Sequence, residues 1–224
     1  MAIEQRATGK GLYAFTPTLL AILLLVSPAG ADQTSLLSGN ALVETLRAGG
    51  LNIYFRHVAT NWSQSDDLRQ WDDWSNCDPA RMRQLSDDGH ADAVAIGNAL
   101  RKLEIPIAQL LASPYCRTLE TARLMNLGPA KPSTEVMNLR AAEYFGGRDA
   151  IVASAQRLLS SEPLAGHNRV IVAHGNVAIA ATTTYPAEGE ALVFEPAGDG
   201  GFNLIGRIEV KHWLGLMQAG DYDE

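Results

Sequence analysis

The sequence of 224 residues lacks the features that mark non-globular and nucleic-acid-binding proteins. It has no low-complexity segment and no internal repeat, and 19% of its residues are charged while 46% are hydrophobic. These proportions exclude a disordered chain, a collagen triple helix and a coiled coil. The sequence also has no basic cluster, since 18 Lys and Arg stand against 25 Asp and Glu, for a net charge of −7. Nucleic acid is therefore not an expected partner.

Long hydrophobic runs are scarce, and the one that stands out lies near the N-terminus, from Leu12 to Val26. Two basic residues precede it, and two small residues, Ala29 and Ala31, follow it. This layout is typical of a secretory signal peptide, residues 1–31, cleaved after Ala31. A single membrane anchor is the alternative, but the run is shorter than the ~20 residues that a spanning helix needs. We expect a periplasmic or secreted protein whose mature chain, 32–224, is a single domain.

Cysteine is almost absent, because the chain has only Cys77 and Cys116. An oxidising compartment would let them pair and close a loop of 38 intervening residues, a constraint that contributes about 3–4 kcal/mol in the chain-entropy picture. Two unpaired thiols are the alternative. A metal site is not expected, since two isolated cysteines without CxxC spacing or a neighbouring His do not form a zinc cage.

From Ser38 onward, strand-like and helix-like segments alternate, which is typical of an α/β domain with a largely parallel sheet. A glycine-rich turn, 198–201, separates two apolar runs and predicts an antiparallel hairpin at one sheet edge. Ser113 and Pro114 predict the cap and first turn of a helix. We expect a three-layer α/β/α sandwich. The predicted strands are 51–55, 107–112, 134–138, 169–173, 191–194 and 202–210, and the predicted helices are 41–48, 86–103, 115–125, 151–159 and 177–181.

A polar and acidic segment, Asn61 to Ala80, interrupts this alternation. It carries five aspartates and three tryptophans, Trp62, Trp71 and Trp74. Its composition predicts a long surface loop with aromatic anchors, covering the pocket of the protein. Its acidity disfavours polyanionic substrates.

Cationic and imidazole side chains follow three of the predicted strands. Arg56 and His57 end the first strand, Arg117 falls in the first turn of a helix, and His174 ends a later strand. In open α/β sheets, ligands bind at the carboxyl ends of the strands. Two Arg forks, two imidazoles and helix N-termini after Ser113 and His174 make an anion pocket that suits a phosphoryl group. A metal held by the two histidines is disfavoured, because Arg56 would lie beside it.

The spelling of these segments adds a resemblance to a known family. YFRHVATNW, LLASPYCRTLETA and VIVAHGN resemble the motifs of the histidine phosphatase superfamily, which is phosphoglycerate-mutase-like, in order and in spacing. The resemblance runs from about Leu51 to Trp213. The stretch Asn76 to Gly89 resembles an exported branch that contains the lipopolysaccharide core heptose phosphatases.

Carried over to this sequence, the resemblance implies that His57 is the nucleophile and forms a phosphohistidine, while Arg56, Arg117 and His174 hold the phosphoryl oxygens. The chemistry of the residues agrees with these roles. A neutral imidazole can attack phosphorus in line, and fixed cations stabilise the transferring group without a metal or other cofactor.

Further residues of the motifs are candidates for binding the substrate. Thr60 keeps the hydroxyl position of the signature and Gly175 follows the second histidine, while Ser63 stands where the family often has a phosphate-binding Asn, which Asn61 could replace. Val58 stands where the signature has Gly, so a close backbone contact with the ligand is expected to be lost.

Several residues are candidates for the general acid. In the family it is often a Glu before Phe-Gly, and Glu143 precedes Tyr144-Phe145-Gly146 with a shift of one position. Glu188, Glu190 or an Asp of the acidic loop are the alternatives, because a leaving alkoxide needs a proton from a nearby group.

These observations predict an exported, metal-independent phosphatase that hydrolyses a small phosphomonoester, and a phosphosugar of the cell envelope is compatible with the resemblance. The alternative from another class is a non-catalytic phosphate- or phosphosugar-binding protein that keeps the anion pocket. A phosphoglycerate-mutase-type transfer is disfavoured by export. The sequence leaves the oligomeric state open.

Overall fold

The computed structural model describes residues 36–219, which fall in a unit of the chain that spans Thr34–Glu224. The predicted signal peptide, residues 1–31, lies outside the described residues. Within the described part, no helix combines the length and the apolar character that crossing a membrane requires.

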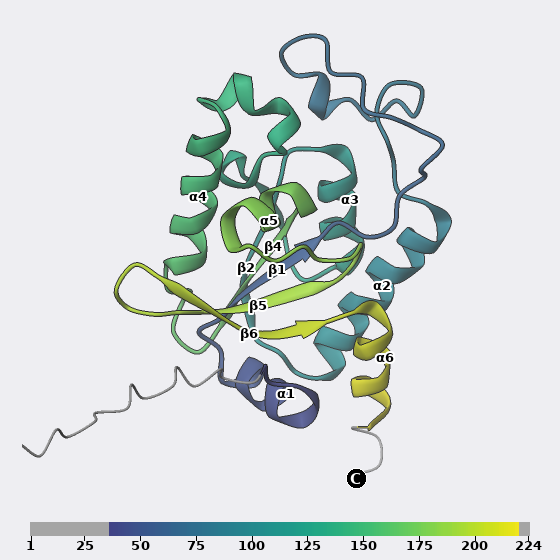
Figure 1. Cartoon of the computed structure of the whole chain (residues 1–224). Coiled ribbons are helices and arrows are strands. Elements are labelled where there is room, and N and C mark those ends of the chain that lie inside the picture. Colours follow the sequence, from purple (N-terminus) through teal and green to yellow (C-terminus); the bar gives the residue numbers. More distant parts are fainter. Residues whose placement is uncertain (1–35, 220–224) are drawn as a thin grey trace, which may run out of the picture. The chain divides into compact units, whose positions relative to one another are not determined.

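The described unit is built on a six-stranded mixed sheet with the strand order β3-β2-β4-β1-β5-β6 (Figure 1). The first four strands in this order are mutually parallel, and β5 and β6 form the predicted antiparallel hairpin at one edge. The predicted fold class is therefore confirmed. The strands are β1 Asn52–Arg56, β2 Ile107–Ala112, β3 Ala130–Pro132, β4 Asn168–Ala173, β5 Ala191–Pro196 and β6 Phe202–Ile208.

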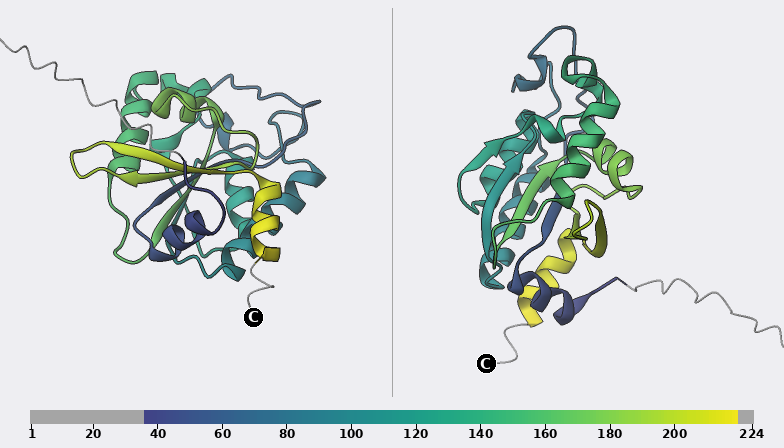
Figure 2. Two further views of the ribbon diagram at one scale, coloured as in Figure 1. Left: turned by 60° about the horizontal axis from the view of Figure 1, so that its bottom comes forward. Right: turned by 90° about the vertical axis from the view of Figure 1, so that its left-hand side faces the viewer.

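Helices cover both faces of the sheet, as Figures 1 and 2 show. Each face has its own cluster of buried apolar side chains, so the sheet is sandwiched between two cores. One face carries α1 Gly39–Ala48, α2 Asp87–Lys102, α3 Cys116–Met125 and α6 Val210–Ala219, and the other carries α4 Arg148–Ser160, α5 Gly175–Thr182 and the 3-10 helices η2 Thr134–Val136 and η3 Leu139–Phe145.

The middle parts of the central strands, 53–55 of β1 and 170–173 of β4, are apolar because both of their faces are buried. Along β1, Ile53 and Phe55 belong to one core while Tyr54, between them, belongs to the other. Val170 and Ile171 of β4 divide between the two cores in the same way. This alternation with period two fixes the register, since a slip by one residue would exchange the two cores.

Two helix starts show how local chemistry sets the boundaries. Ser86 caps α2 as predicted, because its hydroxyl accepts the backbone N–H of Gly89 at 3.1 Å. By contrast, Ser113 is not the cap of α3, so that prediction is wrong. The helix begins at Cys116 after Tyr115, and the hydroxyl of Ser113 is engaged with His174 instead.

The predicted strand 134–138 is also wrong. The edge strand is β3, four residues earlier, and the segment 134–138 contains η2. The hydroxyl of Ser133 accepts the backbone N–H of Glu135, and the side chain of Asn138 accepts that of Arg140. Such short-range bonds favour turns over an extended ladder, and the apolar content of the segment did not reveal them.

The acidic segment Asn61 to Ala80 is a loop, as predicted, with one 3-10 turn, η1 Asp73–Ser75. Only one of its tryptophans is an anchor. Trp74 is buried, whereas Trp62 and Trp71 are 68% and 59% exposed. The ring of Trp71 rests edge-on against that of Trp74, with 4.6 Å between centroids.

Helix α5 contains the predicted helix 177–181 and packs against the sheet on one side. Its Ile179 is 40% exposed, while Val177 and Ala178 are buried against the sheet.

Candidate active site

The strands β1, β4 and β2 are neighbours and parallel, so their carboxyl ends meet at one edge of the sheet. The chain leaves these ends as Arg56-His57, as His174 and as the turn into α3 that carries Arg117. All four side chains line one pocket of about 120 Å³. The structure therefore brings together the four residues on which the sequence prediction depends. The pocket is lined by Arg56, His57, Trp62, Asp66, Arg83, Arg117, Asn138, Arg140, His174, Gly175, Asn176 and Tyr185.

His57 is buried and held in one tautomer. Its backbone N–H donates to the carbonyl of Ala173 at 3.0 Å, which ties it to the end of β4. Its Nδ1 lies 3.0 Å from the carbonyl oxygen of Val58, and because a carbonyl can only accept, Nδ1 carries the proton. Burial, and then the charge of Arg117, hold the pKa of His57 well below its usual value. His57 is therefore neutral at pH 7, with a free lone pair on Nε2.

His174 is the second buried imidazole, 5.7 Å from His57 between ring centroids. Its backbone is fixed by Tyr54, whose hydroxyl donates to the carbonyl of His174 and accepts its N–H. Its Nε2 lies 2.9 Å from the hydroxyl oxygen of Ser113. Burial, and then the charge of Arg117, lower the pKa of His174 well below its usual value. Its Nδ1 has no hydrogen-bond partner within residues 36–219, and such a buried group is costly unless a ligand completes it.

The two predicted arginines are each paired with a carboxylate. Arg117 is 2% exposed, and its two terminal nitrogens donate to the carboxylate of Asp66 at 2.9 and 3.0 Å. Arg56 is also buried, donates to the carbonyl of Pro186 at 3.2 Å and lies 3.3 Å from a carboxylate oxygen of Glu188. These contacts fix both guanidinium groups at the pocket before any ligand arrives.

The sequence reasoning missed two further arginines of the pocket. Arg83 is half-buried and lies over the indole of Trp62, with 4.0 Å between its guanidinium carbon and the ring centroid. Arg140 is exposed and donates to the backbone carbonyl of Asp66 at 3.3 Å. Arg83 stands in the stretch 76–89 that carries the subfamily resemblance, which was the available signal.

Of three other lining residues, Asn176 ends the motif VIVAHGN, whereas Asn138 and Tyr185 belong to no motif that could have revealed them. The amide of Asn176 donates to the side-chain oxygen of Asn138 at 2.8 Å, so residues that are distant in the sequence meet at the pocket.

The predicted substrate-binding residues lie at different places relative to the pocket. Gly175 lines the pocket, and a Cβ there would lie 2.8 Å from the ring of Tyr185, so a larger residue would displace that ring. Thr60 is buried beside the pocket and donates to Glu188 at 2.8 Å. Asn61 and Ser63 lie outside the pocket lining, because Asn61 accepts the N–H and hydroxyl of Ser63 in an exposed local turn.

Val58, in the place of the signature glycine, is not among the residues that line the pocket. Its side chain is buried in the core on the α2 side of the sheet. Its carbonyl accepts from the imidazole of His57, and this contact sets the tautomer of the ring.

The predicted general acid, Glu143, is exposed in η3 and is absent from the pocket lining. Among its rivals, Glu190 is buried and occupied by Arg207 and by the backbone N–H of Ala187. Glu188 lies beside the pocket, against Arg56, Thr60 and Trp62. Neither Glu143 nor Glu188 is among the lining residues, but Glu188 contacts two of them, Arg56 and Trp62.

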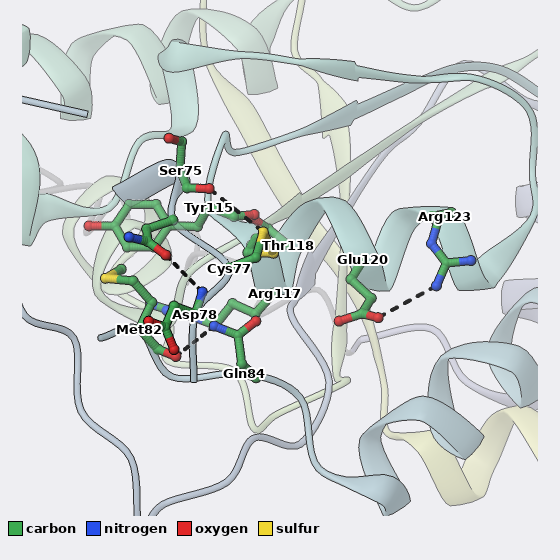
Figure 3. The surroundings of a disulfide bond; sticks show 12 residues. Ser75, Cys77, Asp78, Met82, Gln84, Tyr115, Arg117, Thr118, Glu120 and Arg123 are labelled. Atoms are coloured by element: carbon green, nitrogen blue, oxygen red, sulfur yellow. Dashed lines mark hydrogen bonds and ion pairs between the residues drawn. A yellow bond between two sulfur atoms is a disulfide. The ribbon is translucent and has the colours of Figure 1, made fainter. Parts of the chain in front are cut away.

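The predicted disulfide is present. Cys77 and Cys116 are joined with 5.5 Å between their Cα atoms, which ties the acidic loop to the first residue of α3. Figure 3 shows Cys77 beside Tyr115 and Arg117, the residues on either side of its partner. The cross-link thus lies one residue away from a pocket arginine.

The charge of the pocket is positive although the loop beside it is acidic. Of the five aspartates of the loop, only Asp66 lines the pocket, and it is paired with Arg117. Asp73, for example, accepts the backbone N–H groups of Arg69 and Gln70 and pairs with Arg81. The acidity of the loop therefore does not extend to the lining of the pocket.

Comparisons with known proteins agree with this fold. The family model described as histidine phosphatase superfamily (branch 1) matches residues 53–146. A solved structure of the protein histidine phosphatase SixA complexed with tungstate is similar in fold, with a TM-score of 0.52 and 14% identity over 72% of this chain and 97% of that chain. The mycobacterial glucosyl-3-phosphoglycerate phosphatase has a TM-score of 0.50 and 16% identity over 72% of this chain and 100% of that chain. No curated protein matches the sequence significantly.

Proposed function

We propose that the chain belongs to the histidine phosphatase superfamily, whose family model matches residues 53–146, and that it hydrolyses phosphomonoesters through a phosphohistidine on His57. One observation carries the proposal. His57 is a neutral imidazole whose free Nε2 lies in a buried pocket with Arg56, Arg117 and His174. A nucleophile with an available lone pair and fixed cations around the transferring group are the two requirements of this chemistry.

In the first step, Nε2 of His57 attacks phosphorus while the bond to the ester oxygen breaks and the leaving group takes the bonding pair with a proton. Arg56 and Arg117 hold the oxygens of the phosphoryl group, and Nδ1 of His174 is the unpartnered atom beside them. In the second step, water attacks the phosphohistidine, the P–N bond breaks and phosphate leaves. Positioned positive charge supplies most of the rate in such a transfer.

We assign the donated proton to Glu188, which lies beside Arg56 at the edge of the pocket. A general acid matters most when the leaving group is a poor one. Glu188→Gln should therefore reduce kcat/KM for an alkyl phosphate by about 100-fold and for an aryl phosphate by less than about 10-fold. Equal losses on both substrates would contradict this assignment.

The test of the function compares wild-type protein with His57→Ala on a generic aryl phosphate. Wild type should release phosphate, and the variant should lose at least about 10⁴-fold in kcat, because the nucleophile itself is removed. His167→Ala is the matched control, since His167 lies outside the pocket lining and its ring bonds to the carbonyl of Ala165. No turnover by wild type would overturn the proposal and leave a phosphate-binding protein.

We further propose that the enzyme is exported, needs no metal and acts on a phosphosugar of the cell envelope, as the heptose phosphatase branch does. The signal-peptide pattern of residues 1–31 and the Cys77–Cys116 disulfide support export, because disulfides persist in oxidising compartments. N-terminal sequencing of the protein from the periplasm or medium should begin at Asp32. Recovery of an uncleaved chain in the membrane fraction would contradict export with cleavage.

A further inference from the structure

One residue of the acidic loop touches three of the four arginines of the pocket. The carboxylate of Asp66 accepts from both terminal nitrogens of Arg117 and from the backbone N–H of Arg83, at 2.9, 3.0 and 3.1 Å. Its backbone carbonyl accepts from the guanidinium of Arg140 at 3.3 Å. The side chain of Asp66 is only 3% exposed, so water does not compete for these bonds.

The loop holds Asp66 at a fixed place, because its outgoing and returning arms are bonded to each other. The backbone N–H of Asp67 donates to the carbonyl of Arg81 at 2.8 Å, and that of Asn61 donates to the carbonyl of Gln84 at 3.0 Å. The Cys77–Cys116 disulfide adds a covalent tie near the start of α3. A carboxylate on this frame can impose a position on the arginines that it contacts.

We propose that Asp66 is a positioning residue, which aligns Arg117 and sets Arg83 beside it for binding the phosphoryl group; the proposal rests on the phosphatase function given above. The pair with Asp66 takes one N–H from each terminal nitrogen of Arg117. The Nε of Arg117 has no partner among the described residues, so one edge of the guanidinium remains for a ligand. Such pre-paired forks bind an oxyanion with little loss of side-chain freedom.

Electrostatics gives Asp66 a second role in the same task. Burial lowers the pKa of Arg83 most, and the charge of Arg117 lowers it further, while the charge of Asp66 raises it. The carboxylate of Asp66 therefore offsets the repulsion between Arg117 and Arg83. Without the carboxylate, Arg117 would be a buried cation facing a second cation. Its guanidinium would then turn away or sample several positions, and the anion would have to order it on binding.

The experiment is a double-mutant cycle on the full mature chain, with Asp66→Ala, Arg117→Ala and both together. The first readout is the Kd for inorganic phosphate from calorimetry, which does not require turnover. Each single variant should weaken binding at least about 10-fold, and the double variant should bind no more weakly than Arg117→Ala alone, because residues that act through each other are non-additive. Asp67→Asn is the control, since Asp67 is paired with Arg69 outside the pocket.

The second readout is kcat/KM for an aryl and an alkyl phosphate. A positioning role predicts that Asp66→Ala loses the same factor on both substrates, whereas a proton donor would lose it mainly on the alkyl phosphate. Should Asp66→Ala fail to fold, Asp66→Asn is the second variant, because it keeps the shape of the side chain and one acceptor oxygen. We expect the same pattern in Kd and kcat/KM, with changes in their logarithms of at least about a third of those for Asp66→Ala.

Additive effects in the cycle, or phosphate binding by Asp66→Ala as tight as in wild type, would overturn the inference while leaving the phosphatase function standing. If wild type binds phosphate but does not turn over any ester, the proposed function fails. The phosphate cycle then still decides whether Asp66 acts through Arg117.

Discussion

Two regions border the pocket: its floor, which His57 and His174 form at the ends of strands, and the acidic loop Asn61 to Ala80. Different interactions hold them in place. On the floor, His57 and His174 follow adjacent parallel strands; a backbone hydrogen bond ties His57 to Ala173 of β4, and the hydroxyl of Tyr54 in β1 holds the backbone of His174. The loop Asn61 to Ala80 has one 3-10 turn and is held by side-chain bonds to its own backbone, by the pairing of its two arms and by one disulfide. The comparison teaches that the sheet places the reactive groups while the loop supplies Asp66, which holds the cations around them.

The two regions also differ in what burial does to their ionisable groups. On the floor, burial lowers the pKa of both histidines and keeps them neutral. In the loop, backbone N–H donors from Arg69 and Gln70 lower the pKa of Asp73 and keep it charged. Desolvation thus prepares a neutral nucleophile, and hydrogen bonding keeps the loop's carboxylate ionised.

Removing the disulfide should destabilise the loop more than the floor. With Cys77→Ser and Cys116→Ser together, the free energy of unfolding should fall by about 4 kcal/mol, because a closed loop of this length is opened in the unfolded chain. In the folded fraction, limited proteolysis should cut first within the loop, residues 61–80, since local opening no longer has a covalent limit. Mass spectrometry of the fragments identifies the cut. First cleavage in β1 or β4 would contradict the division into floor and loop.

Acidification should have the opposite effect and destabilise the floor before the loop. The pKa values of His57 and His174 are lower in the folded state than the unfolded value of about 6.5, so the unfolded chain binds more protons below that pH. Stability is therefore full above pH 6.5 and falls as the pH drops, by up to about 1.4 kcal/mol per pH unit for each histidine.

Urea unfolding at pH 7.5, 6.5 and 5.5 measures this slope. His57→Gln should halve the part of the slope that the two histidines supply. Asp73, whose pKa is lowered, contributes only at more acidic pH. The same slope in His57→Gln as in wild type would show that His57 is not buried neutral.

The smallest effects should come from residues that the sequence placed in the site and the structure does not. Asn61→Ala should leave kcat/KM within about twofold of wild type and stability within ~0.5 kcal/mol, as for an exposed position that forms a local turn. Glu143→Gln should leave kcat/KM and stability within the same limits. Steady-state kinetics on an aryl and an alkyl phosphate measures both variants, and a tenfold loss in either would return that residue to the site.

The fold could be predicted because its signals are local. The apolar runs of β1, β2 and β4 reflect burial on both faces, and the hairpin follows from two apolar runs around a glycine-rich turn. The segment 134–138 and the cap of α3 were predicted wrongly because the competing hydrogen bonds of Ser133 and Ser113 are not visible in residue spacing.

The site could be predicted only where it is attached to strand ends. Arg56, His57, Arg117 and His174 follow from that rule and from the motifs. Asp66 could not be selected among five aspartates, because its role depends on three arginines that approach it from other parts of the chain. The motif suggested Glu143 as the acid, whereas only the folded chain shows that Glu188 lies beside the pocket.

Trapping of the covalent intermediate tests the central claim most directly. Wild-type protein is mixed with an aryl phosphate, quenched in base to protect an acid-labile phosphohistidine, digested and mapped by mass spectrometry. Our account predicts a phosphoryl group on the peptide of His57, absent from His57→Ala and present in His167→Ala. Phosphate release by wild type with no phosphoryl group on His57, or with the group on His174, would contradict it.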